Sequence, residues 1–300
     1  MTELAVSRRE IRRIQSGLAD DIAARERTLA QELPVDAPAN VPARLRALVD
    51  NWESGRKSLR TVPVCNVYAA HCGREVPASV KRSLTGLDAT INVLDDIIDT
   101  RELEKETKIA LTINAAFSGV MLVENCPADA REDVSELLFD YYTSVFQIPL
   151  VERELLERMR SASFPAERRD AASSLYAYRA RDIDAFARFP AVVMGVDEQT
   201  EQRLVDDLRA YRCRRLLFKD IADVERDLAD EDRTPIIQLL ESCDTTEEVV
   251  DEVEELYADF DYSEAGRQEY GDLLFELENA PEDLHEVVSR ARAMLPEAAV

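Results

Sequence analysis

The chain has 300 residues, of which 46% are hydrophobic and 33% charged, so it can bury a sizeable core and is not a disordered tail. Acidic residues outnumber basic ones 61 to 37, which gives a formal net charge of -24 at pH 7. Such a surface repels phosphate backbones and anionic lipid headgroups, which argues against nucleic-acid and membrane-surface binding. With 8 glycines and 12 prolines, the composition favours helices over sandwiches, barrels and glycine-rich nucleotide folds.

The choice of charged and sulfur-containing residues predicts a cytoplasmic, halophilic protein. Acidic side chains with little lysine resemble the cytosolic proteins of salt-loving archaea, where a solvated acidic surface keeps a protein soluble in brine. The five cysteines are scattered without a CxxC pair, which fits reduced thiols rather than a zinc site or a disulfide framework. The charged N-terminus lacks the apolar core of a signal peptide, and the longest uncharged run, 109–123, is too short to span a membrane.

Helical periodicity dominates the first third of the chain. Residues before Pro34 are predicted to form one amphipathic helix, and the three prolines in 33–44 predict a loop. We expect a helix over Ser58–His71, ended by a left-handed Gly73, and another from Pro77 through Asp99.

The rest of the chain is predicted to be helical as well. The expected helices are an apolar one over Lys108–Val123, one starting after Pro127, and long ones over Pro165–Gly195, Glu198–Leu228 and from Asp244 onward. No strand alternation or long internal repeat interrupts them.

These elements predict an all-α fold built as a single large helical bundle. We expect residues 1–50 to be an N-terminal accessory helix and loop, and 51–243 to be the core. Residues 244–300 are predicted to be acidic helices that pack on the outside of that core.

Two aspartate clusters follow apolar helical turns. Helical spacing places members of each cluster on one face, and the clusters comprise Asp95, Asp96 and Asp99, and Asp220, Asp223 and Asp227. Like charges along one face repel each other, and a divalent cation relieves that repulsion. Oxygen ligands without histidine or cysteine suit Mg²⁺, which also binds substrate phosphates. The alternative is a pair of solvated acidic surfaces, which a chain this acidic produces readily.

A diphosphate held by such a site also needs cationic side chains. Lys57 and Arg60 are three residues apart in a basic segment and could bind one phosphate group together. Arg179 and Arg181 could reach the same cavity from an adjacent helix. The alternative for each arginine is a surface salt bridge with a neighbouring carboxylate.

The order of these segments resembles the trans-isoprenyl diphosphate synthases (polyprenyl synthases). The resemblance is carried first by GRKSLRTVPVCNVYAAHCG and GLDATINVLDDIID, which are similar to the family's GGKRLRP-type segment and its DDxxD helix. It continues in LRAYRCRRLLFKDIADVERD and DLADEDRTPIIQLLE, which are similar to the second aspartate-rich helix and the segment that follows it. Order and spacing agree from about Gly55 to Leu240.

The resemblance implies a class I isoprenoid synthase bundle, with Mg²⁺ as cofactor and allylic and isopentenyl diphosphates as substrates. Ionisation of the allylic diphosphate leaves a carbocation that isopentenyl diphosphate attacks, and the apolar interior shields the cation from water. By position, Asp95, Asp96 and Asp99 match the first metal motif, and Asp220 and Asp223 approximate the second. Lys57 and Arg60 match the residues that bind isopentenyl diphosphate. The resemblance also suggests a homodimer.

Several positions depart from the family pattern. Lys105, preceded by Glu104, stands where the family has an Arg-Arg pair, and Asp88 stands where a histidine commonly helps hold isopentenyl diphosphate. Lys219 replaces a glutamine, and Ala222 breaks the Asp pair of the second motif. The Lys-Thr expected before that motif is missing, so that Arg179 or Arg181 would have to substitute for it.

Three functions are therefore open. The first is a Mg²⁺-dependent prenyltransferase that condenses isopentenyl diphosphate with an allylic diphosphate. The second is a class I terpene or head-to-head prenyl synthase, which also ionises an allylic diphosphate. The third is a non-catalytic homologue that serves as a partner subunit.

Overall fold

The computed structural model describes residues 5–32, 60–99, 123–124, 126–270 and 279–295. Helices form the regular structure of these residues, and no strand occurs among them, so the predicted all-α class is confirmed. The chain divides into two compact units, one comprising Met1–Leu138 with Arg188–Asp197 and the other Phe139–Ala187 with Glu198–Val300. The boundaries predicted at residues 50 and 243 stay a prediction.

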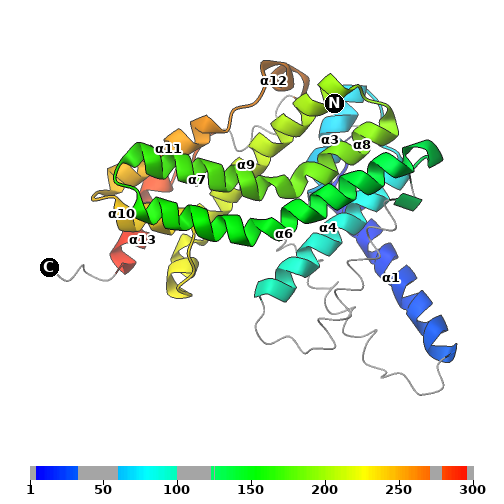
Figure 1. Ribbon diagram of the computed structural model, residues 1–300, viewed down its shortest axis with the longest axis horizontal. Coiled ribbons are helices and arrows are strands. Elements are labelled where there is room, and N and C mark those ends of the chain that lie inside the picture. The colour runs from blue at the N-terminus through cyan, green and yellow to red at the C-terminus, as the bar shows by residue number, and fades with distance from the viewer. Residues whose placement is uncertain (1–4, 33–59, 100–122, 125, 271–278, 296–300) are drawn as a thin grey trace. The chain divides into compact units, whose positions relative to one another are not determined.

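The first unit contains α1 (Arg8–Glu32), α3 (Thr61–Cys72) and α4 (Ala78–Asp99). These bounds confirm the helices predicted before Pro34 and up to Gly73 and Asp99. Contacts among all three helices (Figure 1) form this unit's core. The buried Ile11 and Leu18 of α1, seven residues apart, contribute to it. The predicted left-handed end of α3 is present, because Gly73 has φ 59°.

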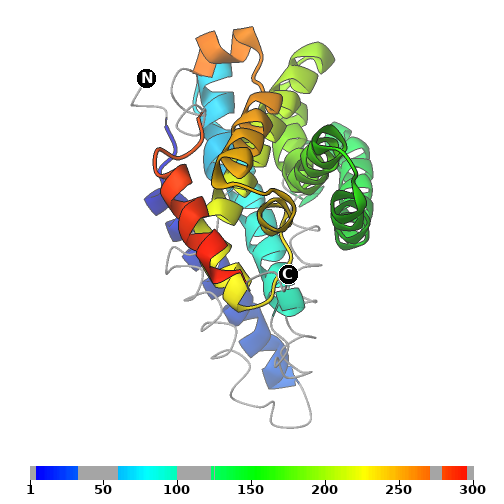
Figure 2. The same cartoon turned by 90° about the vertical axis from the view of Figure 1, so that its left-hand side faces the viewer.

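The second unit is organised around its longest helix, α9. Beyond the first three helices, the described residues form, in chain order, η1 (Ala128–Ala130), α6 (Arg131–Ser161), α7 (Pro165–Arg179), η2 (Ala180–Ile183), α8 (Asp184–Met194), α9 (Glu198–Ala229), α10 (Pro235–Ser242), α11 (Thr246–Asp259), α12 (Glu264–Tyr270) and α13 (Leu284–Met294). Helices α6 and α8 extend across the division into units. Helices α7, α10 and α13 pack against α9, and α11 packs against α7, α10 and α13. Figure 2 shows α13 beside the C-terminal turns of α9, where Arg290 Nε lies 2.7 Å from Glu225 Oε1.

The C-terminal helices begin at cap residues that the sequence signals. Thr245 and Glu248 form a reciprocal capping box at the start of α11, which begins where a helix was predicted from Asp244 onward. Thr234 accepts a hydrogen bond from the Ile237 amide, and Pro235 follows it at the first position of α10. Apolar side chains of α10, α11 and α13 then join those of α7 and α9 in one core, for example Leu239, Val253 and Val288.

The prediction of a single helix over Pro165–Gly195 is wrong in one respect, because the structure divides this range into α7, the 3₁₀ turn η2 and α8. Two carboxylates at this junction point to arginines of α9. Asp182 accepts two hydrogen bonds from Arg212 at 2.8 and 2.6 Å, and Asp184 accepts two from Arg209, both at 2.7 Å. These tertiary contacts stabilise a tighter turn that helical periodicity does not reveal.

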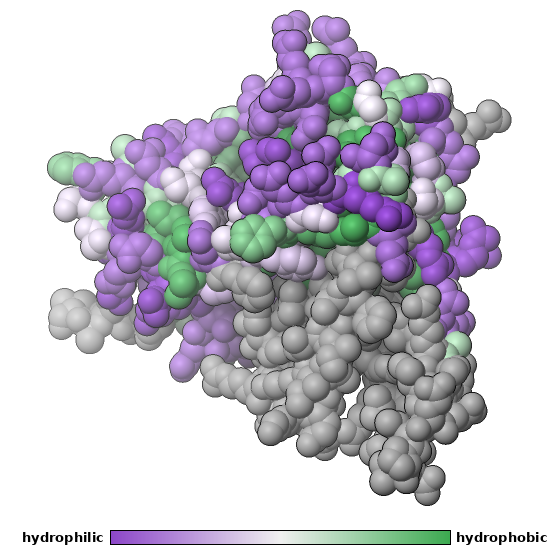
Figure 3. All heavy atoms as spheres, turned by 45° about the vertical axis from the view of Figure 1, so that its right-hand side comes forward, coloured by the Kyte–Doolittle hydropathy of each residue, from purple (hydrophilic) through white to green (hydrophobic). Residues whose placement is uncertain are grey.

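The surface of the described residues agrees with the composition. In the face that Figure 3 shows, hydrophilic residues cover most of the described surface, with smaller apolar areas between them. All five cysteines are free thiols, and only Cys72 among them is not fully buried. Within the described ranges, no helix combines the length and the apolar character needed to cross a bilayer.

Candidate functional site

The second aspartate cluster lies on the C-terminal half of α9. Asp220, Asp223 and Asp227 follow the spacing i, i+3 and i+7, so the helix places them along one face. Their side chains are 5%, 26% and 10% exposed. The row is therefore partly withdrawn from water, as a site that holds a cation requires, but each carboxylate already has a partner in the chain.

Asp220 is held by two residues of α7. Its Oδ2 accepts a hydrogen bond from the Tyr176 hydroxyl at 3.0 Å and one from Arg179 Nη1 at 2.9 Å. Burial raises the pKa of Tyr176 well above its usual value, and the nearby Asp220 carboxylate adds to that rise, so the hydroxyl stays a donor. Although burial acts in the opposite direction, the carboxylates of Asp220 and Glu152 raise the pKa of Arg179. Asp220 is thus fixed as part of a buried polar network.

Asp223 and Asp227 share a different arginine. Arg226 Nη2 lies 2.9 Å from Asp223 Oδ2 and 3.0 Å from Asp227 Oδ1. Burial raises the pKa of Asp227, and the guanidinium of Arg226 acts against that rise. One guanidinium nitrogen therefore contacts both carboxylates and offsets part of their mutual repulsion.

The first aspartate cluster is positioned by α4, which ends at Asp99. The side chains of Asp95, Asp96 and Asp99 lie outside the described part of the structure, as do Lys57 and Lys105. The hypothesis that the two clusters face one cavity accordingly stays a prediction.

Arg60 points into the first unit, where it pairs with Asp88. Arg60 Nη1 lies 3.2 Å from Asp88 Oδ1, and the two side chains are 5% and 0% exposed. Asp88 Oδ2 also accepts hydrogen bonds from the backbone N–H and the hydroxyl of Thr61, each at 3.0 Å. Burial raises the pKa of Asp88, while Arg60 and Thr61 act in the opposite direction. Asp88 thereby caps the first turn of α3 from α4 and supplies Arg60 with an internal counter-charge.

The remaining cations differ in their surroundings. Arg181 is exposed, and its guanidinium carbon lies 4.8 Å from the centre of the Tyr178 ring, whereas Arg179 is partly buried against Asp220. Of the two, Arg179 is the one that the structure brings to the α9 cluster. Lys219, next to Asp220 in the sequence, is exposed.

Two residues of this site were missed by reasoning from sequence. Tyr176 and Arg226 both contact the α9 aspartates, yet neither was singled out. Arg226 carried a signal, because an arginine three residues after one aspartate and next to another can reach both on a helix. Tyr176 carried none, since its contact depends on how α7 packs against α9.

Only some of the three α9 aspartates are suited to bind magnesium. Among the described residues, no group of three or more His, Cys, Asp or Glu side chains converges as metal ligands. Asp220 does not fit, because Tyr176 and Arg179 hold its carboxylate in a buried network. Asp223 and Asp227 do fit, because their two neighbouring carboxylates have a mainly exposed arginine as partner, and Mg²⁺ is typically held by one or two carboxylates with water and phosphate.

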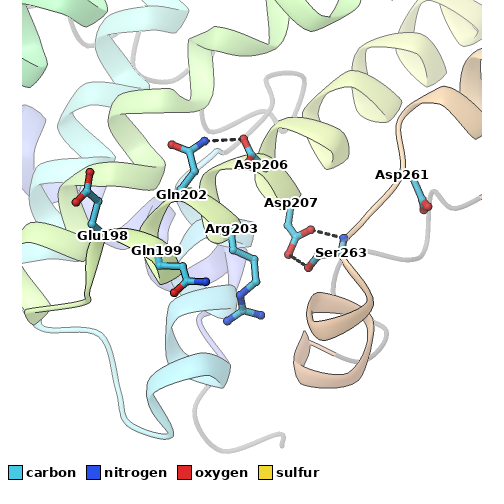
Figure 4. A pocket seen from close by; sticks show the side chains of 8 residues that line it. All are labelled: Glu198, Gln199, Gln202, Arg203, Asp206, Asp207, Asp261 and Ser263. Carbon is cyan, nitrogen blue, oxygen red and sulfur yellow. Dashed lines mark hydrogen bonds between the residues drawn. The ribbon is translucent and has the colours of Figure 1, made fainter.

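A separate polar cavity of about 600 Å³ lies at the other end of α9. Figure 4 shows Asp207 in its wall, where it accepts hydrogen bonds from the Ser263 amide at 2.6 Å and hydroxyl at 2.7 Å. A Cβ on Gly266 would lie 2.3 Å from Asp207 Oδ2, so a larger residue there would displace the Asp207 carboxylate from this position. These contacts attach α12 to α9. The polar residues Asp207 and Ser263 in the cavity wall therefore have a structural role.

Comparisons with known proteins bear on the fold. No protein-family model matches the chain, and no curated protein matches it in sequence. A solved geranylgeranyl pyrophosphate synthetase from the archaeon Geoglobus acetivorans is 16% identical, with a TM-score of 0.51 over 95% of this chain and 98% of that chain. The geranylgeranyl pyrophosphate synthetase from Pyrococcus horikoshii Ot3 is 13% identical, with a TM-score of 0.51 over 95% of this chain and 94% of that one. The chain therefore has the all-α fold of these two synthetases, as its motif order led us to expect.

Proposed function

We propose that this protein is a prenyltransferase that binds an allylic diphosphate and condenses it with isopentenyl diphosphate. The observation that carries the proposal is the likeness to two geranylgeranyl pyrophosphate synthetases along nearly the whole chain. The aspartates of α4 and α9, which stand in the order of the two metal motifs, support it. Asp95, Asp96 and Asp99 would hold Mg²⁺ on α4, and Asp223 and Asp227 would hold it on α9.

Magnesium, when bound, would neutralise the charge that develops on the departing diphosphate. Residues of the chain itself would form the surroundings in which the diphosphate departs. Tyr176 and Arg179 fix Asp220 and so hold α7 against α9, the helix that also carries Asp223 and Asp227. The apolar side chains of α7 and α9, such as Leu217 and Ile221, exclude water from the bundle interior, where an allylic cation would otherwise be quenched.

A specific observation favours a second candidate, a class I synthase that ionises one allylic diphosphate without isopentenyl diphosphate. The motif resemblance assigns Arg60 to isopentenyl diphosphate, but Arg60 forms a buried ion pair with Asp88. An arginine whose charge is neutralised inside the protein attracts a second diphosphate less strongly. A non-catalytic partner subunit is the third possibility, and a product assay separates all three.

The assay uses purified full-length protein in molar salt with Mg²⁺ and a radiolabelled allylic diphosphate, with and without isopentenyl diphosphate. We expect a longer prenyl diphosphate to form when both substrates are present, detected by chromatography. Release of diphosphate with a hydrocarbon or alcohol from the allylic substrate alone would instead identify the single-substrate synthase. The absence of both products, together with unchanged allylic diphosphate, would overturn the enzyme proposal in favour of the partner subunit.

We also propose that the protein forms a homodimer through α6. Phe139 and Leu150 are 72% and 61% exposed, which is unusual for large apolar side chains. They are eleven residues apart on one helix, so three turns place them on the same face. In an antiparallel pair of α6 helices related by a twofold axis, Phe139 of one copy would lie opposite Leu150 of the other.

Replacing both Phe139 and Leu150 with aspartate is expected to convert the dimer into a monomer, because the pairing would then bury four carboxylates. Size-exclusion chromatography with multi-angle light scattering measures the mass directly. The control is Phe164→Asp, which changes an exposed phenylalanine outside α6 and should leave the dimer intact. A monomeric wild-type protein, or a dimer that survives the double substitution, would refute this interface.

A further inference from the structure

Arg226 on α9 lies where a cation would have to approach Asp223 and Asp227. A single nitrogen of Arg226, Nη2, lies 2.9 Å from Asp223 Oδ2 and 3.0 Å from Asp227 Oδ1. Asp223 and Asp227 are four residues apart, so their carboxylates are neighbours on one helical face. The positively charged group therefore stands between the two carboxylates that would hold a divalent cation.

The three side chains differ in solvent exposure, and this difference determines which of them can turn into solvent. Arg226 is 61% exposed, whereas Asp223 and Asp227 are 26% and 10% exposed. An ion pair with an exposed arginine is weak, and the long side chain can turn into solvent without disturbing the core. The carboxylates of Asp223 and Asp227, by contrast, are mostly buried and therefore less free to turn into solvent. Arg226 is thus the replaceable member of the group.

Asp220 provides the contrast within the same row. Its arginine partner, Arg179, is only 20% exposed and also lies 3.9 Å from Glu152 Oε1, and Tyr176 donates a second hydrogen bond. Displacing Arg179 would leave buried groups without partners, which costs far more than releasing a surface arginine. A cation can therefore compete for Asp223 and Asp227 but not for Asp220.

We propose that Arg226 is an internal counter-cation that occupies the place of a divalent cation between Asp223 and Asp227 and is displaced when one binds. This inference rests on the proposed function, which assigns these two aspartates to Mg²⁺. In the cation-free protein, Arg226 relieves the repulsion between the two carboxylates. The same contact lowers the affinity for the metal, because binding must first break two ion pairs.

The test is direct cation binding by the full-length protein without substrate. Titration with Mn²⁺ is followed by electron paramagnetic resonance of the free ion and repeated with Mg²⁺ by isothermal titration calorimetry. The site-specific component is the binding that Asp223→Asn removes, which separates it from general binding to the acidic surface. We expect Arg226→Gln to lower the dissociation constant of this component about threefold to tenfold, as the loss of two competing exposed ion pairs implies.

The matched control is Arg290→Gln. Arg290 is also exposed and pairs with α9 through Glu225, next to Arg226 in the sequence, but Asp223 and Asp227 are not its partners. This variant removes the same charge from the same neighbourhood, so its dissociation constant should stay within about twofold of wild type. Arg226→Lys, which keeps the charge, should fall between wild type and Arg226→Gln.

The outcomes distinguish the two proposals. Equal tightening in Arg226→Gln and Arg290→Gln would overturn the inference, because net charge alone would then explain it. Binding that depends on Asp223 but not on Arg226 would also overturn it, while leaving the proposed metal site standing. Binding that neither Asp223→Asn nor Arg226→Gln changes would remove α9 from the metal site, and with it both the inference and that part of the proposed function.

Discussion

Replacing Arg212 with methionine is expected to lower the free energy of unfolding by about 3–5 kcal/mol. Arg212 donates from Nε and Nη2 to the two oxygens of Asp182, and the two side chains are 9% and 10% exposed. Methionine keeps much of the volume but leaves the Asp182 carboxylate buried without its guanidinium partner. The cost of burying that carboxylate without the guanidinium, rather than the lost attraction, dominates the effect.

Chemical denaturation followed by circular dichroism, at constant high salt, measures the change. Arg290→Met is the control, because Arg290 makes two exposed ion pairs and its loss should cost less than about 1 kcal/mol. A double variant, Arg212→Met with Asp182→Leu, should recover most of the stability, since an apolar pair can replace a buried ion pair. An unfolding free energy of Arg212→Met equal to that of Arg290→Met would contradict the role assigned to this pair.

Asp99→Asn and Asp223→Asn are each expected to reduce product formation by about 10²–10³-fold. The reason is that each change removes a negative ligand from a proposed metal site, and the loss of one well-placed electrostatic contact to a developing charge typically has this size. Initial rates of prenyl diphosphate formation at saturating substrate measure the effect. Because asparagine preserves the shape of the side chain, the helices should keep their stability.

Asp230→Asn is the matched control for Asp223→Asn. Asp230 is exposed directly after α9, so this variant removes one carboxylate from the same region without touching either cluster. Its rate should stay within about twofold of wild type. If Asp230→Asn lost as much activity as Asp223→Asn, a general charge effect would explain both, and the assignment of Asp223 to the metal would fail.

The position of Asp88 shows how a single residue can redirect a site. Its carboxylate binds Arg60 and caps α3, so Arg60, which the motif resemblance relates to isopentenyl diphosphate binding, also takes part in the packing of the first unit. Asp220 follows the same logic with Arg179 and Tyr176. In both places the acidic side chain has its counter-charge within the protein.

Much of the local structure could be predicted because its causes are local. Helical periodicity defined α1, α4 and α9, Gly73 ended α3, and Thr245 with Glu248 began α11. These signals depend on backbone conformation and on side chains within one or two turns, so the sequence alone contains them. The break of the helix after Arg179 was not predictable, because distant arginines of α9 stabilise η2.

The sequence by itself determined an all-α chain with two aspartate-bearing helices, since composition, spacing and caps act over short distances. Only the tertiary structure decided the partners of the charges: Arg60 with Asp88, Arg179 with Asp220, and Arg212 with Asp182. Ion pairs in a chain with this many carboxylates and arginines have many possible combinations in sequence. Packing of the helices selects among them, because burial makes an unpaired charge far more costly than an exposed one.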